Sequence, residues 1–253
     1  MDRGPRRALS PPARRSPVAA PSSTPASVDR APARTRWWGF GVYAAVSAAH
    51  VLALIARADS FVYPTKLLLM PALALAALVA LGTAANSRAG ALLLLATALS
   101  WLGDGAGFFF PFLADELPAM LLCFGLAHLA YIVLFQRDLA RRPIPRWTLA
   151  YSVWWVGMIV LLWPHLGALA IAVAAYGLVL GGTAASAARG SRITATGGAF
   201  FLASDTLLAL LLFLPGMSAA LTGPWVMLTY TIGQGLLVLG AVRLLAPAQE
   251  RNR

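Results

Sequence analysis

Apolar runs close to the length that crosses a bilayer recur along almost the whole chain, and they constrain its fold more than any other feature. A hydrocarbon core about 30 Å thick takes about 20 apolar residues per helix. Eight such runs are present, at 37–56, 66–83, 90–110, 117–136, 147–163, 166–187, 194–214 and 224–245. Charged residues make up only 11% of the chain, against about 25% in a soluble domain. The sequence therefore predicts an all-α polytopic membrane protein with eight transmembrane helices in one domain, residues 37–246.

The two ends of the chain differ from this domain. Residues 1–36 are rich in Arg, Pro, Ala and Ser and have no apolar period. Such a segment cannot bury enough apolar surface to offset the entropy of ordering it, so we expect a disordered tail. Residues 247–253 are expected to be a short cytoplasmic tail.

The net charge of +11 reflects how the basic residues are distributed. If the N-terminus is cytoplasmic, 18 of the 20 basic residues fall on the cytoplasmic side, and only Arg57 and Lys66 fall on the other. This asymmetry follows the positive-inside rule and favours an even number of spans. We therefore expect both termini in the cytoplasm and a multi-pass protein of the inner (plasma) membrane. The partner of this basic chain is the lipid bilayer, with no nucleic acid.

Two aspartates, Asp104 and Asp205, are the only acidic residues in the middle of long apolar runs. Ionisable groups at membrane depth are costly and usually mark a functional site. Each aspartate lies in the third run of its half of the chain, so the two helices run in the same direction. This spacing is consistent with two parallel four-helix repeats. The bland alternative is that each carboxyl only bonds across helices.

Other polar residues lie at compatible depths. At about 1.5 Å per residue, Asp104, Asp205, His128 and Gln234 all lie about 15–20 Å from an end of their runs. His128 could orient an aspartate or shuttle a proton, or it could be a satisfied interhelical histidine. Similar alternatives apply to three more polar groups, which either contact substrate or hold helices together: Tyr131, Tyr230 and Gln234. Lys66 could pair with a lipid phosphate or extend to the interface.

Four motifs resemble those of the YhhN-like lysoplasmalogenase family. They are YPTKLLLM at 63–70, ALSWLGD at 98–104, GLAHLAYI at 125–132 and GAFFLASDTLLA at 198–209. Their order and spacing agree with the family over residues 40–245. The resemblance implies an eight-helix membrane hydrolase that cleaves the vinyl ether bond of a lysophospholipid, a lysoplasmalogen, to a fatty aldehyde and a glycerophospho-alcohol.

Vinyl ether hydrolysis indicates what the site must supply. The bond is labile to acid, so a site needs a proton donor, a stabiliser of the oxocarbenium ion and a positioned water. Two nearby carboxyls can divide this work, as they do in glycosidases. We therefore assign catalysis to Asp104, Asp205 and His128, without deciding which aspartate is the acid. The residues expected to bind substrate are Lys66, Tyr131, Tyr230 and Gln234.

Other kinds of site find less support in the sequence. The chain has no Gly-x-Ser-x-Gly elbow, no His-Glu-x-x-His and no phosphate loop. It has three histidines, of which only His128 matches the aspartates in depth, so we expect no metal and no cofactor. A proton-coupled transporter, or a protein that binds lysolipid without catalysis, is the alternative. Helix breaks beside both aspartates would favour the transporter, and Gly103, Gly105 and Gly107 offer a break only beside Asp104.

Overall fold

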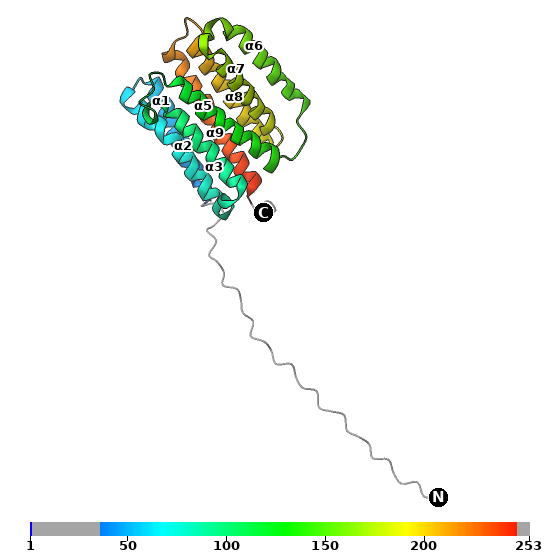
Figure 1. Cartoon of the computed structure of the whole chain (residues 1–253). Coiled ribbons are helices and arrows are strands. Elements are labelled where there is room, and N and C mark those ends of the chain that lie inside the picture. Colours follow the sequence, from blue (N-terminus) through cyan, green and yellow to red (C-terminus); the bar gives the residue numbers. More distant parts are fainter. Residues whose placement is uncertain (2–35, 247–253) are drawn as a thin grey trace. The chain divides into compact units, whose positions relative to one another are not determined.

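The structure, a computed structural model, describes Met1 and residues 36–246 of the chain. The tails expected at 1–36 and 247–253 lie outside the described residues, apart from Met1 and Arg36, and both stay predictions. Residues 36–246 are helices joined by short connections, with no strand among them (Figure 1). The all-α prediction is therefore confirmed for this part of the chain.

The longer helices are joined by loops, some of which contain short helical turns. They are α1 (Trp38–Ile55), α2 (Asp59–Leu81), α3 (Arg88–Asp104), α5 (Leu117–Val133), α6 (Leu149–Leu166), α7 (Ala170–Ala187), α8 (Arg192–Phe213) and α9 (Ala219–Leu245). The shorter elements are α4 (Ala106–Phe109), the 3₁₀ turns η2 (Gly82–Asn86), η4 (Arg146–Thr148) and η5 (Gly167–Leu169), and the π turn η3 (Leu134–Asp138).

Six helical stretches in the described part of the chain are long and apolar enough to cross a membrane. This supports a polytopic membrane protein. One of the six, Arg146–Ala187, has 42 residues and contains both α6 and α7, which pack against each other. The helix α3 has 17 residues and is not among the six. The number eight, the repeats and the side on which the termini lie stay predictions.

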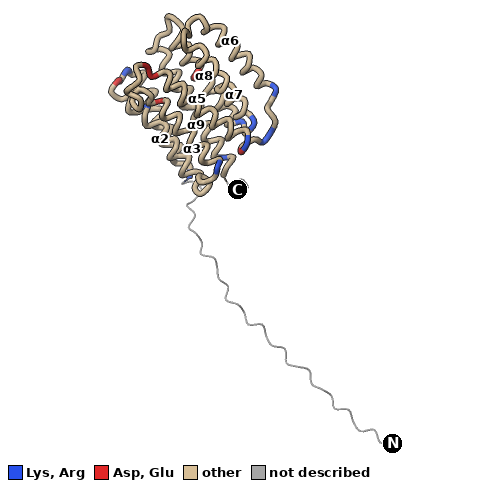
Figure 2. The backbone as a smooth tube through the Cα atoms, in the orientation of Figure 1, with Lys and Arg blue, Asp and Glu red and all other residues tan. Residues whose placement is uncertain are grey.

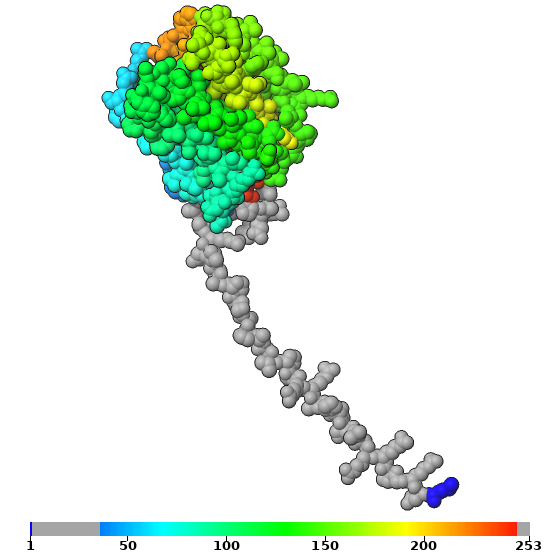
Figure 3. All heavy atoms as spheres, viewed as in Figure 1, coloured from blue at the N-terminus to red at the C-terminus, as the bar shows by residue number. Residues whose placement is uncertain are grey.

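The helix α9 lies at the centre of the packing. It contacts α1, α2, α3 and α8, and the remaining neighbours are α1 with α2, α2 with α3, α3 with α5, α5 with α7, and α7 with α8. The helix α6 packs on α7 and α8 at the edge of this bundle (Figures 1 and 3). The helix α9 therefore packs against helices from both halves of the chain.

Glycines allow the close approach of α8 and α9. A Cβ atom on Gly197 would lie 2.6 Å from the backbone nitrogen of Leu237, and one on Gly233 would lie 2.7 Å from that of Phe201. Lipid chains are as apolar as leucine, so helices in a membrane associate through tight packing of small residues and through polar contacts. The two glycines thus fix the position of α9 relative to the Asp205 helix.

Most of the basic residues in the described part of the chain lie at one end of the bundle (Figure 2). The connections α2–α3, α5–α6 and α7–α8 meet at that end. Arg142 donates to the carbonyl of Ala188 at 2.7 Å, and Arg189 donates to the carbonyl of Arg142 at 3.0 Å, so two of these connections are bonded together. These basic connections, which the sequence places on one side of the membrane, thus lie at one end of the bundle.

Candidate active site

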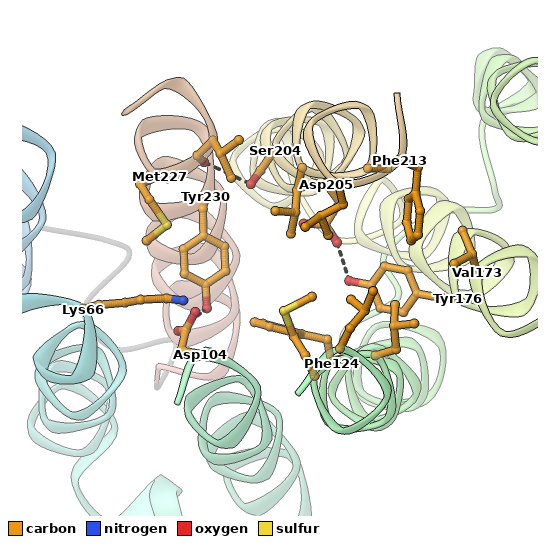
Figure 4. A pocket seen from close by; sticks show the side chains of 17 residues that line it. Lys66, Asp104, Phe124, Val173, Tyr176, Ser204, Asp205, Phe213, Met227 and Tyr230 are labelled. Carbon is orange, nitrogen blue, oxygen red and sulfur yellow. Dashed lines mark hydrogen bonds between the residues drawn. The ribbon is translucent and has the colours of Figure 1, made fainter. Parts of the chain in front are cut away.

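A cavity of about 120 Å³ lies between α2, α3, α5, α7, α8 and α9 (Figure 4). Most of its lining is apolar. Its polar residues are Lys66, Asp104, Tyr176, Ser204, Asp205 and Tyr230. Since one water occupies about 30 Å³ of liquid, the cavity has room for several waters or for the reactive part of a lipid.

Asp104 enters the cavity at the point where its helix ends. The run at 90–110 was expected to be one span, but α3 stops at Asp104, Gly105 leaves the helical conformation at φ −103° and ψ 24°, and α4 follows. The break that the glycines offered beside Asp104 is thus present, since glycine is a poor helix former, and the crossing of a membrane by this run stays a prediction. A Cβ on Gly105 would also lie 2.6 Å from the Phe109 ring. The break places a carboxyl, 7% exposed, at the end of a helix rather than on its side.

The helix α9 and the helix α2 contribute the neighbours of Asp104. Tyr230 donates its hydroxyl to Asp104 Oδ2 at 2.7 Å. Trp101 donates to the carbonyl of Leu67 at 3.0 Å, which ties α3 to α2 beside Lys66. The Lys66 ammonium points toward Asp104 and the Tyr230 hydroxyl (Figure 4). A carboxyl, a phenol and a cation therefore form one group on this side of the cavity.

Asp205 lies on a continuous helix. Ser191 and Thr194 form a capping box that starts α8, with hydrogen bonds of 3.1 and 2.9 Å between side chain and backbone. Tyr176 of α7 donates its hydroxyl to Asp205 Oδ2. The neighbouring Ser204 donates to the carbonyl of Val226 at 3.0 Å. Ser204 is thus engaged in holding α8 to α9, which agrees with a structural role.

His128 lies next to the pair of Tyr176 and Asp205, on the side of Tyr176. Its Nε2 lies 3.4 Å from the Tyr176 hydroxyl, a long hydrogen bond, and its ring contacts Phe201 at 4.8 Å between centroids. The other ring nitrogen, Nδ1, is buried without a partner among the described residues. His128 therefore reaches Asp205 only through Tyr176, and it does not line the cavity.

Of the residues expected to bind substrate, the structure brings Lys66 and Tyr230 to the cavity and leaves Tyr131 and Gln234 outside its lining. Tyr131 donates to Gln234 Oε1 at 2.8 Å, and Gln234 donates to Ser100 Oγ at 2.9 Å. Both side chains are fully buried. They link α5, α9 and α3 in one polar network, and their binding role stays a prediction.

Sequence reasoning missed Tyr176, the cavity residue that donates a hydrogen bond to Asp205. It lies in a helix made largely of Ala, Gly, Leu and Val. The same counting of depth that aligned His128 with the aspartates would have selected it, since Tyr176 lies ten residues into the run at 166–187, about 15 Å deep. Within residues 36–246, the His, Cys, Asp and Glu side chains form no group of three that could hold a metal ion.

Comparisons with known proteins give one match. The model of the family described as the YhhN family matches residues 61–241, a range that includes every residue that lines the cavity. Searches of curated proteins and of solved structures found no match.

Proposed function

The chain belongs to the YhhN family, and on that premise we propose that it is a membrane hydrolase that cleaves the vinyl ether bond of lysoplasmalogens. The products are a fatty aldehyde and a glycerophospho-alcohol. One observation carries the proposal: Asp104 and Asp205, the two carboxyls of one largely apolar cavity, each accept a hydrogen bond from a tyrosine hydroxyl. A pair of carboxyls in different surroundings is what general acid–base chemistry at an oxocarbenium centre needs.

The surroundings of the two carboxyls support an assignment of roles. Lys66 points toward Asp104 (Figure 4), and a cation nearby favours the charged form of a carboxyl. Tyr176 is the hydrogen-bond partner of Asp205, on the other side of the cavity. We therefore assign the ionised role to Asp104 and the role of proton donor to Asp205.

The reaction then proceeds by proton transfers between these groups and the substrate. The Asp205 carboxyl gives its proton to the β-carbon of the vinyl ether, and the π electrons form the new C–H bond. The Asp104 carboxylate stabilises the resulting oxocarbenium ion. Water adds to the α-carbon and loses a proton to Asp104, which gives a hemiacetal.

Collapse of the hemiacetal restores both carboxyls. Asp104 returns its proton to the departing glycerol oxygen as the C–O bond breaks, and the hemiacetal hydroxyl gives its proton to the Asp205 carboxylate as the aldehyde forms. The net reaction consumes one water. Tyr230 and Tyr176 hold the carboxyls in place throughout, because each donates to an Oδ2 atom.

The helix geometry supports an enzyme over a transporter. Carriers commonly place substrate and ion sites at interrupted helices of both repeats. Here α3 is broken beside Asp104, whereas α8 runs without interruption from Arg192 to Phe213 through Asp205. The break at only one of the two carboxyls therefore favours the enzyme over the transporter.

The test is aldehyde release by the purified full-length protein given lysoplasmenylethanolamine, with the saturated ether and the ester as comparison substrates. We expect aldehyde from the vinyl ether alone. Asp104→Asn and Asp205→Asn should each lower kcat by at least about 100-fold, in line with the usual size of general acid–base catalysis. Asp59→Asn, which changes an exposed carboxyl outside the cavity, is the matched control. Full activity in both cavity variants, or no aldehyde from folded wild-type protein, contradicts the proposal.

A further inference from the structure

A second cavity, of about 50 Å³, lies between α6, α7 and α8. It shares Val173, Tyr176, Asp205 and Ala209 with the first cavity. The bonded pair of Tyr176 and Asp205 therefore stands where the two cavities meet. A substrate bound at Asp205 is therefore next to both cavities.

The linings of the two cavities differ in chemistry. The first contains the ammonium of Lys66. The second, apart from the shared pair, is lined by Trp154, Trp155, Met158, Ile159, Leu162, Val173, Gly177, Leu180 and Ala209. Both indole nitrogens are engaged, Trp154 with Thr206 at 3.0 Å and Trp155 with the carbonyl of Ala174 at 2.9 Å. The second cavity thus offers an apolar surface to a ligand.

We propose that the second cavity binds the hydrocarbon chain of the lysolipid next to the bond that is cleaved. This inference rests on the proposed function. The vinyl ether joins a polar glycerophosphate to an apolar chain, and Asp205 must reach the first carbons of that chain. A substrate that lies with its phosphate toward Lys66 and its vinyl ether between the aspartates places its chain past Asp205, where the apolar cavity begins.

The position of α6 explains how so small a cavity serves a long chain. The helix packs on α7 and α8 at the edge of the bundle (Figure 3). Its outward side chains Val153 and Val160 are 73% and 71% exposed and face the region that lipid occupies in a membrane. The cavity holds only the first carbons, and the rest of the chain continues beside α6 into the bilayer. The same route returns the fatty aldehyde to the membrane.

Two matched variants test the site by activity. A Cβ on Gly177 would lie 3.1 Å from Trp155 Cδ1, so Gly177→Leu fills the second cavity, whereas a Cβ on Gly157 of α6 meets nothing within 4 Å. We expect Gly177→Leu to lower kcat/KM for a hexadecenyl substrate by about tenfold or more, the usual effect of misfit in an apolar pocket. The kcat/KM for an ethenyl substrate, whose chain ends at the vinyl carbons and so does not enter the second cavity, should change by less than about threefold, as should that of Gly157→Leu with either substrate. An equal loss for both chain lengths in Gly177→Leu overturns the proposal.

Crosslinking tests the site without catalysis and without a variant. The probe is a saturated ether lysophospholipid that carries a diazirine on the chain close to the ether oxygen, bound to wild-type protein in lipid nanodiscs. Labels on Trp155, Met158 or Ile159 are expected. Labels confined to Leu117, Leu121 and Phe213 of the first cavity, or no label in either cavity, overturn the proposal. The positions of the labels do not depend on turnover. They therefore test the binding site of the chain, whereas a failure of aldehyde release contradicts the proposed function.

Discussion

Tyr230 and Asp104 lie 126 positions apart in the chain, yet the Tyr230 hydroxyl donates a hydrogen bond of 2.7 Å to the Asp104 carboxyl. The bond joins α9 to the broken end of α3, so it connects the two halves of the sequence inside the cavity. Asp205 has its tyrosine from α7 in its own half. The two carboxyls therefore occupy similar positions in sequence but have hydrogen-bond partners from different parts of the chain.

Removal of the Tyr230 hydroxyl should weaken catalysis without unfolding the protein. A hydrogen bond to a charged group contributes about 1.5–3 kcal/mol. If the bond holds Asp104 in its reactive orientation, Tyr230→Phe lowers kcat by roughly 10–150-fold. The control is Tyr43→Phe, which removes an equally buried bond, Tyr43 to the carbonyl of Thr231 at 2.7 Å, outside the cavity. Equal kcat in Tyr230→Phe and wild type argues against this role.

His128 should act through Tyr176 and not on the substrate directly, because Tyr176 stands between it and Asp205. His128→Phe keeps a ring against Phe201 and removes both nitrogens. We expect a loss in kcat of about 3–10-fold, and no further loss when the same change is made in Tyr176→Phe, since residues in one network are not additive. Kinetics of the two single variants and the double variant decide this. If the kcat losses of the two single variants multiply in the double variant, His128 contributes independently of Tyr176.

The sequence predicts the general arrangement well, because length, apolarity and the cost of a buried charge are local properties. They indicate the helices and select Asp104 and Asp205, which line the same cavity. The end of α3 at Asp104 is harder to predict, since three glycines near a carboxyl allow either a helix or a break. In the structure the helix ends at Asp104, and a Cβ added at Gly105 would collide with Phe109 and Leu67.

The sequence does not reveal which side of each helix faces the cavity. A helix that is apolar on every side has no polar face to indicate which residues point inward. Counting along the sequence gives Gln234 a depth similar to that of the aspartates, but Gln234 bonds to Tyr131 and Ser100 and does not line the cavity. Tyr176 faces the cavity because α7 lies between α5 and α8, a neighbourhood that depends on the whole bundle.

The network of Tyr131, Gln234 and Ser100 should therefore affect stability more than turnover. Gln234→Leu leaves the Tyr131 hydroxyl without an acceptor, at a cost of about 1–3 kcal/mol for an unpaired buried group. We expect a lower Tm and a specific activity per folded molecule within about twofold of wild type. Adding Tyr131→Phe removes the unpaired hydroxyl and should restore part of the Tm. A large loss of activity at unchanged Tm would instead support the predicted role in substrate binding.

Close packing of α8 and α9 should tolerate no side chain at Gly197. A Cβ there meets the backbone nitrogen of Leu237 at 2.6 Å, and backbone cannot move aside as a flexible side chain does. Gly197→Ala must separate the two helices, so we expect a lower Tm and less folded protein in size-exclusion chromatography. The control is Gly223→Ala on α9, where a Cβ meets nothing within 4 Å. Equal Tm values for both variants would mean that the helices separate at no cost.

Lys66 should serve both the charge on Asp104 and the phosphate of the substrate, and the two contributions can be separated. Without the ammonium, nothing cationic in the cavity lining favours the Asp104 carboxylate, so Lys66→Met should lower kcat by roughly 10–100-fold for any vinyl ether substrate. The lost phosphate contact should raise KM for lysoplasmenylethanolamine and leave KM unchanged for an alkenylglycerol that has no phosphate. Lys66→Arg retains the charge and should recover most of both effects.

If Lys66→Met changes KM for the phospholipid alone, the cation binds the headgroup but does not sustain the charge on Asp104. Unchanged kinetics with both substrates would place Lys66 outside the reaction altogether.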